Sequence, residues 1–566
     1  MSERTTGERS ADLILYSDAV LTMGEAPAAA VDGLAVRDGR IVSVGTRLEL
    51  EAWRGESSIV VDLGSRALLP GFIDVHAHAE VASRTLYATV DCRAPECSEI
   101  GHVLQRLYEG LTTYSRDGWL VGQGNLFFDQ KLAEKRLPTR AELDSVSDKV
   151  AIALRAGGHI TVLNTRALEE AGIGRGYEAP KHSITGRPDV ELGTDGEPSG
   201  VVREFDNALP FPELDDVDLE RALEEGIGRL FTANGVTRVG EISETVGGLQ
   251  LIDRLIAERR LGVRMAVYLW APGTMSADAA CDWRTQLRLR CDERQFRIQG
   301  LKLFADGGYS AASAAVKRPY LDGHCGHIAL EQVELARILE RSAEAGLQLA
   351  VHANGDEAQE WVCRTIAQHG GAPAGALRTR VEHAGNFLPD YATTTAAWRD
   401  AGIIPVPQPV FLYTFGEFFS AYLGPYGDRG RFPFRRLLDD GWELTGSSDA
   451  WIGSEDDATN PLFSIWCCLA RRTFLGRIID VEQAIDIEEA LRMHTINAAR
   501  VLGVEEECGS LAVGKLADLV ALDRDPRTVG IDELRQLKVE TVWLEGRAVH
   551  QRTPAIHSSS AHLERA

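Results

Sequence analysis

Six side chains of types that bind metal ions stand at or near the ends of apolar segments that are far apart in the chain. They are His76, His78, Lys302, His352, His383 and Asp449. His76 and His78 are two residues apart, so a strand would place both imidazoles on one face. Imidazole and carboxylate groups are ligands of zinc-like divalent metals. Each residue alone could be a buried polar side chain with its hydrogen bonds made inside the core, but the repeated pattern predicts one shared metal site.

Lys302 differs from the other five because it lies inside an apolar segment, Arg297–Phe304. A buried ammonium group is costly unless its charge is removed or paired. The sequence therefore indicates that the Lys302 amine is neutralised or paired inside the fold.

Eight apolar segments, separated by amphipathic stretches such as Val333–Ala345 and Gln359–Gln368, predict an α/β fold. We expect a (β/α)8 TIM barrel, in which the carboxyl ends of the strands meet at the active-site mouth. An open doubly wound sheet is the alternative. No Gly-x-Gly-x-x-Gly follows a strand, which disfavours dinucleotide binding. The expected strands are Gly71–His78, Gly235–Ile242, Gly262–Leu269, Arg297–Phe304, Leu347–His352, Arg378–His383, Gly402–Pro407 and Glu443–Asp449.

The two ends of the chain are rich in short strands and tight turns, unlike the middle. We expect residues 1–68 and 500–553 to form one small β-sandwich domain, and residues 69–499 to form the barrel. More than 150 residues separate the first two expected strands, which is too long for one crossover helix. Residues 80–225 are therefore expected to form an inserted subdomain over the barrel mouth.

Composition excludes several classes of protein. The 566 residues carry 60 Lys and Arg against 84 Asp and Glu, a net charge of −24, so nucleic acid and anionic membranes are poor partners. No apolar run approaches the roughly 18 residues of a membrane span. The nine cysteines are scattered, with no Cys-x-x-Cys, and the first residues lack the apolar core of a signal peptide. We expect reduced thiols and a cytoplasmic protein.

Taken together, these segments resemble the amidohydrolase superfamily over about residues 11–550. Gly300–Gly308, Val351–Asp356 and Arg380–Ala384 resemble its amidohydrolase-3 branch, although Glu357 stands where that branch usually carries arginine. The resemblance implies two divalent metal ions, most often zinc. His76, His78 and Asp449 would bind one ion, and His352 and His383 the other. N6-carboxylated Lys302 would bridge both ions; a free Lys302 beside a single metal is the alternative.

The resemblance also implies a reaction. Metal lowers the pKa of bound water from 15.7 to about 7, so the pair would hold a hydroxide at neutral pH. Asp449 would act as general base and then as general acid toward the departing nitrogen. His159, within Ala156–Asn164, would polarise the substrate carbonyl or contact the substrate, and a purely structural histidine is equally compatible.

Substrate contacts are expected mainly from aromatic residues. The segment 411–434 holds nine aromatics in 24 residues and directly follows the seventh expected strand. An apolar pocket for a hydrophobic or aryl-bearing substrate is one interpretation; a lid on the inserted subdomain and a dimer contact are the others. The predicted substrate-binding residues are Trp119, Phe127, Asp306, Tyr309, Phe415 and Phe418.

The predicted activity is metal-dependent hydrolysis of a non-peptide C–N bond in a small N-acyl or N-formyl amine, by a homodimer. A deaminase of the same superfamily would carry glutamate where Gly355 stands. A lactonase, esterase or phosphotriesterase on the same metal pair is the alternative. A third possibility is an inactive barrel used as a scaffold, which the retention of all six ligand-type residues disfavours.

Overall fold

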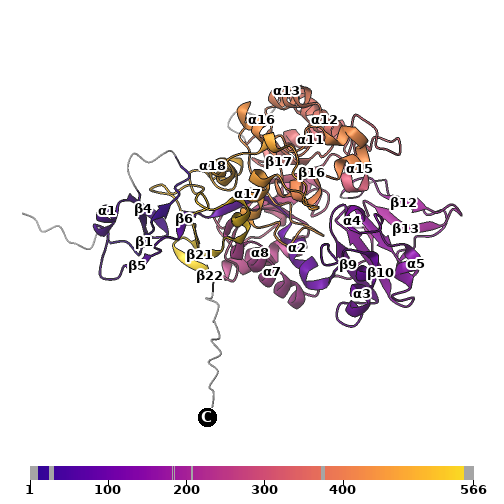
Figure 1. Cartoon of the computed structure of the whole chain (residues 1–566), viewed down its shortest axis with the longest axis horizontal. Helices are drawn as coiled ribbons and strands as arrows, with labels where there is room; N and C mark the ends of the chain where they lie inside the picture. The colour runs from indigo at the N-terminus through magenta and orange to yellow at the C-terminus, as the bar shows by residue number, and fades with distance from the viewer. Residues whose placement is uncertain are drawn as a thin grey trace, which may run out of the picture.

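A curled parallel sheet forms the centre of the protein. The computed structural model describes residues 10–24, 31–181, 183, 185–205, 208–370 and 377–552. Seven parallel strands run in the order β19-β18-β17-β16-β15-β14-β7, with helices around them (Figure 1). The expected TIM-like barrel and the additional sheet domains are thus confirmed. The strands are β7 (Phe72–Ala77), β14 (Val236–Ser243), β15 (Arg264–Trp270), β16 (Phe296–Phe304), β17 (Gln348–His352), β18 (Arg380–Glu382) and β19 (Ile404–Val406).

The eighth expected strand, Glu443–Asp449, is not a strand in the structure. Its backbone nevertheless lies beside β7, because Asp449 N donates to His76 O at 2.8 Å and His78 N donates to Ala450 O at 2.9 Å. No regular ladder forms, since Ser448 N donates to the Asp74 carboxylate and Asp449 has a left-handed φ of 46°. The segment therefore fills the position of strand eight while its backbone turns Asp449 toward the centre.

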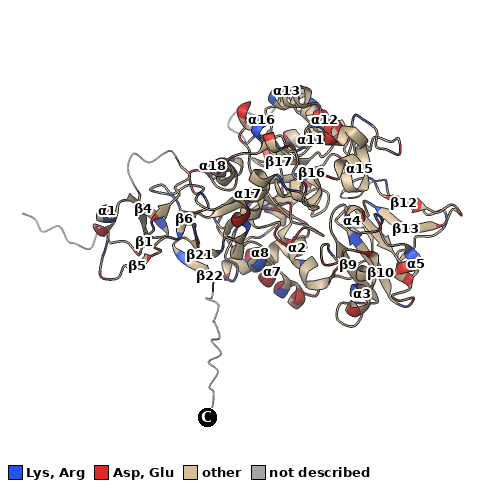
Figure 2. Ribbon diagram, viewed as in Figure 1, with Lys and Arg blue, Asp and Glu red and all other residues tan. Residues whose placement is uncertain are grey.

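Amphipathic helices cover the sheet, and both predicted helices occur, as α11 (Gln332–Glu344) and α12 (Asp356–Gln368). In α7 (Asp216–Leu230), Asp215 accepts from Asp218 N at the N-terminus, and Gly226 packs directly on α2 (Ala79–Ala88). Acidic and basic residues both occur on outer helices such as α3 (Ile100–Gly110), α5 (Arg140–Asp144) and α7 (Figure 2). Other helices are α8 (Val246–Ala257), α13 (Tyr391–Ala401), α14 (Val410–Phe415), α15 (Phe419–Leu423), α17 (Pro461–Ala470), α18 (Ile487–Met493) and α19 (Ile496–Val501).

Both ends of the chain build two sheets at one side of the barrel (Figure 1). The sheets run β4-β3-β1-β5 and β2-β6-β20-β21-β22, and β6 pairs antiparallel with β20. Residues of both sheets share one core, and buried Arg264 of the barrel donates to Asp518 at 2.7 Å. The strands are β1 (Leu13–Tyr16), β2 (Ala19–Val20), β3 (Gly33–Arg37), β4 (Arg40–Gly45), β5 (Ile59–Asp62), β6 (Ala67–Pro70), β20 (Leu519–Leu522), β21 (Val539–Leu544) and β22 (Arg547–Gln551).

A separate six-stranded sheet lies between β7 and β14 in the chain, within the expected insertion. Its order is β12-β13-β11-β10-β9-β8. It approaches the barrel mouth, because Phe127 stacks on Phe415 at 5.1 Å and Tyr422 donates to Asp129 at 3.0 Å. The exact domain boundaries stay a prediction. The strands are β8 (Val90–Asp91), β9 (Trp119–Gly124), β10 (Ala151–Ala156), β11 (Ile160–Leu163), β12 (Asp189–Leu192) and β13 (Pro198–Arg203).

Across the described residues, no helix combines the length and the apolar character needed to cross a bilayer.

His494, at the end of α18, gives the fold an acid-sensitive element outside the site. Burial lowers its pKa to about 4, and its Nε2 contacts Ser464 Oγ at 2.8 Å. The unfolded chain binds the proton near pH 6.5, so acidification from about 6.5 to about 4 should cost about 3 kcal/mol of stability. We expect His494→Gln to lose less stability over this range in urea titrations. If wild type and His494→Gln lose the same free energy of unfolding over this pH range, this role of His494 is contradicted.

Candidate metal centre

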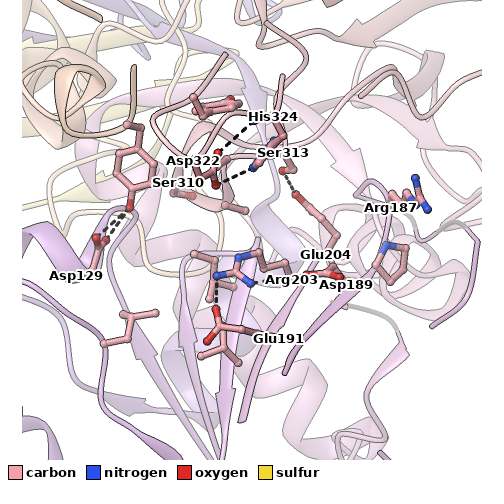
Figure 3. Close-up of a pocket in the computed structure, with 18 of the residues that line it drawn as sticks. Asp129, Arg187, Asp189, Glu191, Arg203, Glu204, Ser310, Ser313, Asp322 and His324 are labelled. Carbon is pink, nitrogen blue, oxygen red and sulfur yellow. Dashed lines mark hydrogen bonds and ion pairs between the residues drawn. The ribbon is translucent and has the colours of Figure 1, made fainter. Parts of the chain in front are cut away.

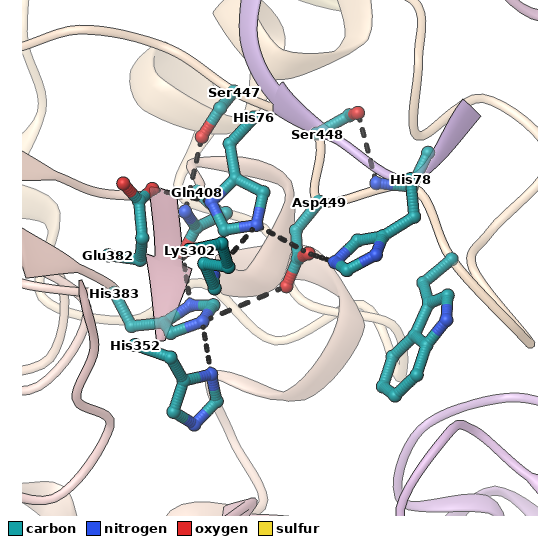
Figure 4. Close-up of polar contacts among 12 residues, drawn as sticks. His76, His78, Lys302, His352, Glu382, His383, Gln408, Ser447, Ser448 and Asp449 are labelled. Atoms are coloured by element: carbon teal, nitrogen blue, oxygen red, sulfur yellow. Dashed lines mark hydrogen bonds and ion pairs between the residues drawn. The ribbon is translucent and has the colours of Figure 1, made fainter. Parts of the chain in front are cut away.

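The six predicted ligand residues converge at the carboxyl ends of the barrel strands (Figure 4). His76 lies in β7 and His78 directly follows it. Lys302 lies in β16, His352 ends β17 and His383 directly follows β18. Asp449 comes from the segment beside β7. Left-handed φ values of 72° at His383 and 46° at Asp449 turn these two side chains inward. Barrel topology thus gathers residues that span more than 370 positions of the chain.

The ligand atoms lie within a few ångströms of one another. His76 Nε2 is 3.2 Å and His78 Nε2 3.5 Å from Asp449 Oδ1, and these three side chains form a group able to hold a metal ion. Lys302 Nζ is 3.3 Å from His76 Nε2. On the other side, His383 Nε2 is 3.0 Å from His352 Nδ1 and 3.9 Å from Asp449 Oδ2.

Hydrogen bonds on the outer nitrogens fix which ring atoms face the centre. Nδ1 of His76 faces the Glu382 carboxylate, and Nδ1 of His383 donates to Gln408 Oε1 at 2.7 Å. Nε2 of His352 donates to the carbonyl of Gly307 at 3.2 Å. The inner nitrogens of these three imidazoles therefore carry lone pairs.

These lone pairs point at one another and at the Asp449 carboxylate. Such an arrangement is repulsive unless a cation lies among the groups, and N and O donors of this kind suit zinc-like divalent ions. Burial lowers the pKa of His78 to about 4 and of His383 to about 3, which keeps their imidazoles neutral, the form that binds metal. The residues present therefore fit a metal centre.

Burial acts on both Lys302 and Asp449 at this centre. Lys302 is fully buried, and burial lowers the pKa of its amine to about 8. Burial also opposes ionisation of the Asp449 carboxyl, so a cation bound between this group and the imidazoles would stabilise its charged form. The site thus presents an amine that is readily neutralised beside a carboxylate that a bound cation would keep ionised.

Glu382 holds His76 from behind. The side chains of Arg380 and Glu382 are both fully buried, and Arg380 Nε donates to Glu382 Oε1 at 2.8 Å. Arg380 also donates to Val75 O at 2.9 Å, which ties β18 to β7. Despite burial, the charge of Arg380 and the hydrogen bond from His76 keep the pKa of Glu382 well below its usual range. This carboxylate fixes the His76 tautomer and raises the basicity of its inner nitrogen.

We predict that Glu382→Gln lowers metal affinity and kcat by about 10–100-fold, the range for partners that orient metal ligands. The amide keeps the size of the side chain and loses its charge. Metal affinity is measured by competition with a chelator. Glu360→Gln serves as the control, because it makes the same change at a buried glutamate of α12 that bonds Lys317 and Thr394. Wild-type affinity in Glu382→Gln would contradict the assignment.

A cavity of about 40 Å³ is lined by five of the six residues, all except His76. Three predicted substrate residues, Phe127, Tyr309 and Phe415, line it together with His159. Trp451 adds a wall that the sequence did not predict: its indole stacks on His78 at 5.2 Å, and a Cβ at Gly158 would lie 2.0 Å from that ring. Apart from Lys302, its lining among the described residues includes no lysine or arginine.

The structure does not bring the other three predicted substrate residues to this inner cavity. Trp119 lies in the core of the inserted sheet, 5.5 Å from Phe211. Phe418 is buried behind Phe127, at 6.0 Å. Asp306 is fully buried and accepts from the backbone N–H groups of Ala315, Asn354 and Gly355, so it holds the loop after β17. The aromatic segment thus serves two purposes: Phe411 and Phe415 line the cavity, and Phe418 and Tyr422 pack on the insertion.

A second cavity, of about 1490 Å³, lies outside the first, between the inserted sheet and the barrel loops (Figure 3). Ser310 lines both cavities. Glu204 borders the outer one, and its Oε2 lies 3.0 Å from Nδ1 of His159. Burial disfavours the charged form of His159, but the charge and hydrogen bond of Glu204 outweigh it and raise the pKa of the imidazole.

The comparisons with known proteins agree with this geometry. The sequence model of the amidohydrolase family matches residues 59–550. The N-substituted formamide deformylase of Arthrobacter pascens is 28% identical over 556 residues, covering 96% of this chain and 99% of the relative. YtcJ of Bacillus subtilis (strain 168), which carries an amidohydrolase name, is 24% identical over 533 residues, covering 92% and 96%.

Among solved structures, an uncharacterized metal-dependent hydrolase from Pyrococcus horikoshii OT3 is similar with a TM-score of 0.68 and 22% identity. The alignment covers 92% of this chain and 98% of that structure. At this identity the likeness shows the fold.

Proposed function

Because the chain belongs to the amidohydrolase family, we propose that it is a metal-dependent hydrolase of N-acyl amines, with small acyl groups such as formyl preferred. The observation that carries the proposal is the convergence of four imidazoles, one amine and one carboxylate on a common centre. The name of the formamide deformylase relative supports the choice of bond.

In this proposal the centre would take two divalent ions, zinc first. His76, His78 and Asp449 would hold one ion, and His352 and His383 the other. The neutral Lys302 amine would add to CO2 with release of a proton, and the resulting carbamate would supply an anionic ligand to the centre. Bound divalent metal polarises a substrate carbonyl and lowers the pKa of water to about 7.

Proton transfer falls to Asp449 in this proposal. Its carboxylate takes the proton of the attacking water and returns it to the departing nitrogen, a role that contributes typically about 10²–10⁴-fold. The aromatic wall of Phe127, Phe411 and Phe415 keeps other water away from the reacting bond.

The sizes of the two cavities suggest how a substrate lies. The inner cavity, about 40 Å³, has room for a formyl group but not for an aryl group, since a water-sized group needs about 10–15 Å³ of such a cavity. The amine substituent would extend past Ser310 into the outer cavity. There a hydrophobic or aryl amine would meet the apolar surfaces of Tyr320, Leu321 and Tyr422.

The test is a hydrolysis screen on metal-replete protein with N-formyl, N-acetyl and N-carbamoyl derivatives of one arylamine and one alkylamine. Lactones, aryl esters and a phosphotriester form the comparison arm. We expect the N-formyl arylamine to give the highest kcat/KM. Turnover of esters or phosphotriesters alone would overturn the choice of C–N bond, and no turnover with full metal content would overturn the function.

We predict that Phe415→Val shifts acyl preference. Valine is smaller than phenylalanine, so the inner cavity becomes larger. We expect kcat/KM for the N-butyryl substrate, relative to the N-formyl substrate, to rise by about 10-fold, which is within the range of discrimination that one or two methylene groups give in a pocket. The ratio is insensitive to loss of folded protein. Phe418→Val is the matched control, because Phe418 is equally buried in the same segment but does not line the cavity. Equal shifts in both variants would contradict the assignment.

A further inference from the structure

Glu204 is a buried carboxylate whose position is unexplained by the metal centre. It is fully buried and follows β13 of the inserted sheet, with a left-handed φ of 56°. That conformation is unfavourable for a residue with a side chain and is retained only where the surroundings impose it. Its backbone N donates to His159 O at 2.8 Å, so the two residues are joined through both backbone and side chain.

Both oxygens of the Glu204 carboxylate are engaged. Oε1 accepts from Ser313 Oγ (Figure 3) and from Gly308 N at 3.4 Å, while Oε2 faces Nδ1 of His159 at 3.0 Å. A Cβ at Gly307 would lie 2.5 Å from Glu204 Oε1. The chain thus leaves space for this carboxylate and fixes its direction.

His159 is the ionisable partner of this carboxylate. Within the described ranges, no lysine or arginine pairs with Glu204, and neighbouring Arg203 pairs with Glu191 at 2.7 Å instead. Because Glu204 accepts the Nδ1 proton, Nε2 is the ring nitrogen left for another contact. The His159 ring lines the inner cavity, edge-on to Trp451 at 5.7 Å and 6.4 Å from the His352 ring.

We propose that Glu204 is a positioning residue, which holds His159 with Nδ1 protonated and turns Nε2 toward the substrate opposite the metal ligands. The inference rests on the proposed hydrolytic function and assigns the inserted subdomain a part in it. Ser313 and Gly308 hold Glu204, Glu204 holds His159, and His159 contacts the scissile group.

Kinetics of a double-mutant cycle test this order. With an N-formyl arylamine, His159→Ala should lower kcat by about 10²–10³-fold, as loss of one polar contact to the reacting oxygen does. Glu204→Gln should lower kcat by about 10–100-fold with KM changed less than threefold. The double variant should match His159→Ala within about twofold, because Glu204 acts through His159. If the loss of kcat in the double variant equals the product of the two single losses, the proposal is overturned.

Two further variants separate positioning from simple destabilisation. Glu360→Gln changes a buried acid that lines neither cavity and bonds Lys317 and Thr394, so it should retain wild-type kcat. Ser313→Ala removes a donor to Glu204 without touching His159 and should lower kcat by a few fold. If Glu360→Gln lowers kcat as much as Glu204→Gln does, the effect is structural and the proposal fails.

A spectroscopic measurement decides the point without turnover. In zinc-loaded protein labelled with ¹⁵N-histidine, the Nδ1–H signal of His159 is identified by its loss in His159→Gln. It should be present in wild type and in Glu360→Gln, and absent in Glu204→Gln. An unchanged signal in Glu204→Gln would overturn the inference even if the enzyme hydrolyses amides. Its loss would support Glu204 even if the substrate proves to be different.

Discussion

Replacing Lys302 by methionine should lower kcat/KM by about 10³–10⁴-fold, the loss expected when several kcal/mol of charge stabilisation disappear. Lys302 is fully buried at the centre of the site, with Nζ 3.3 Å from His76 Nε2. Methionine fills the same space with an apolar group and cannot carry a carboxylate. Metal content, measured by atomic emission on gel-filtered protein, should fall from two ions per chain to one or fewer.

Lys302→Ala offers a sharper version of the same experiment. It leaves a space in which a short carboxylic acid can replace the proposed carbamate, so propionate should restore part of the activity and of the metal content. Lys302→Met is the matched control, because its side chain occupies that space and should show no rescue. Apoprotein reconstituted with zinc should also require bicarbonate. Full activity and two metals in Lys302→Met would contradict the bridging role.

Much of the fold was predictable because the barrel strands are buried on both faces and most of them are largely apolar. Such strands appear in the sequence as continuous hydrophobic segments. Seven of the eight segments expected to be strands are strands in the structure. The run Glu443–Asp449 is the exception. Its backbone groups bond to β7, to Met493 and to the Asp74 side chain rather than to a regular ladder. Composition does not encode which partner a buried N–H finds, so the sequence predicted the position of this segment but not its conformation.

The six candidate ligands were predictable because their types and their places at strand ends repeat along the chain. The residues that orient them were not predicted. Arg380 and Glu382 carried a usable signal, a charged pair at i and i+2 in a short buried strand, directly before His383. Glu204 carried none, since it meets His159 from another strand, 45 residues away.

Aromatic residues gave the weakest predictions. Phe415 lines the inner cavity, whereas Phe418, three residues later, packs behind it, and Trp119 lies in the core of the insertion. Residue type indicates that such side chains are buried. It does not indicate which buried surface they contact, because this depends on how the inserted sheet docks on the barrel.

Asp449→Asn should lower kcat by about 10³-fold or more, because it removes both a negative charge from the centre and the group that would carry the proton. Asparagine keeps the shape of the side chain, and its amide oxygen can still face His76 and His78. The two effects can be separated by varying the departing amine. A proton donor matters most for alkylamines, which leave poorly as anions, and least for nitroanilines, which leave readily.

The loss in Asp449→Asn should therefore be at least 10-fold greater for N-formyl alkylamines than for N-formyl nitroanilines. Glu382→Gln is the matched control, because Glu382 touches His76 but not the centre itself, so its loss should be the same for every amine. Kinetics are compared at equal measured metal content, so that weakened binding of the ions does not enter the ratio. An equal loss across all amines in Asp449→Asn would leave Asp449 as a ligand and remove its role in proton transfer, since only a donor to the nitrogen distinguishes one leaving group from another.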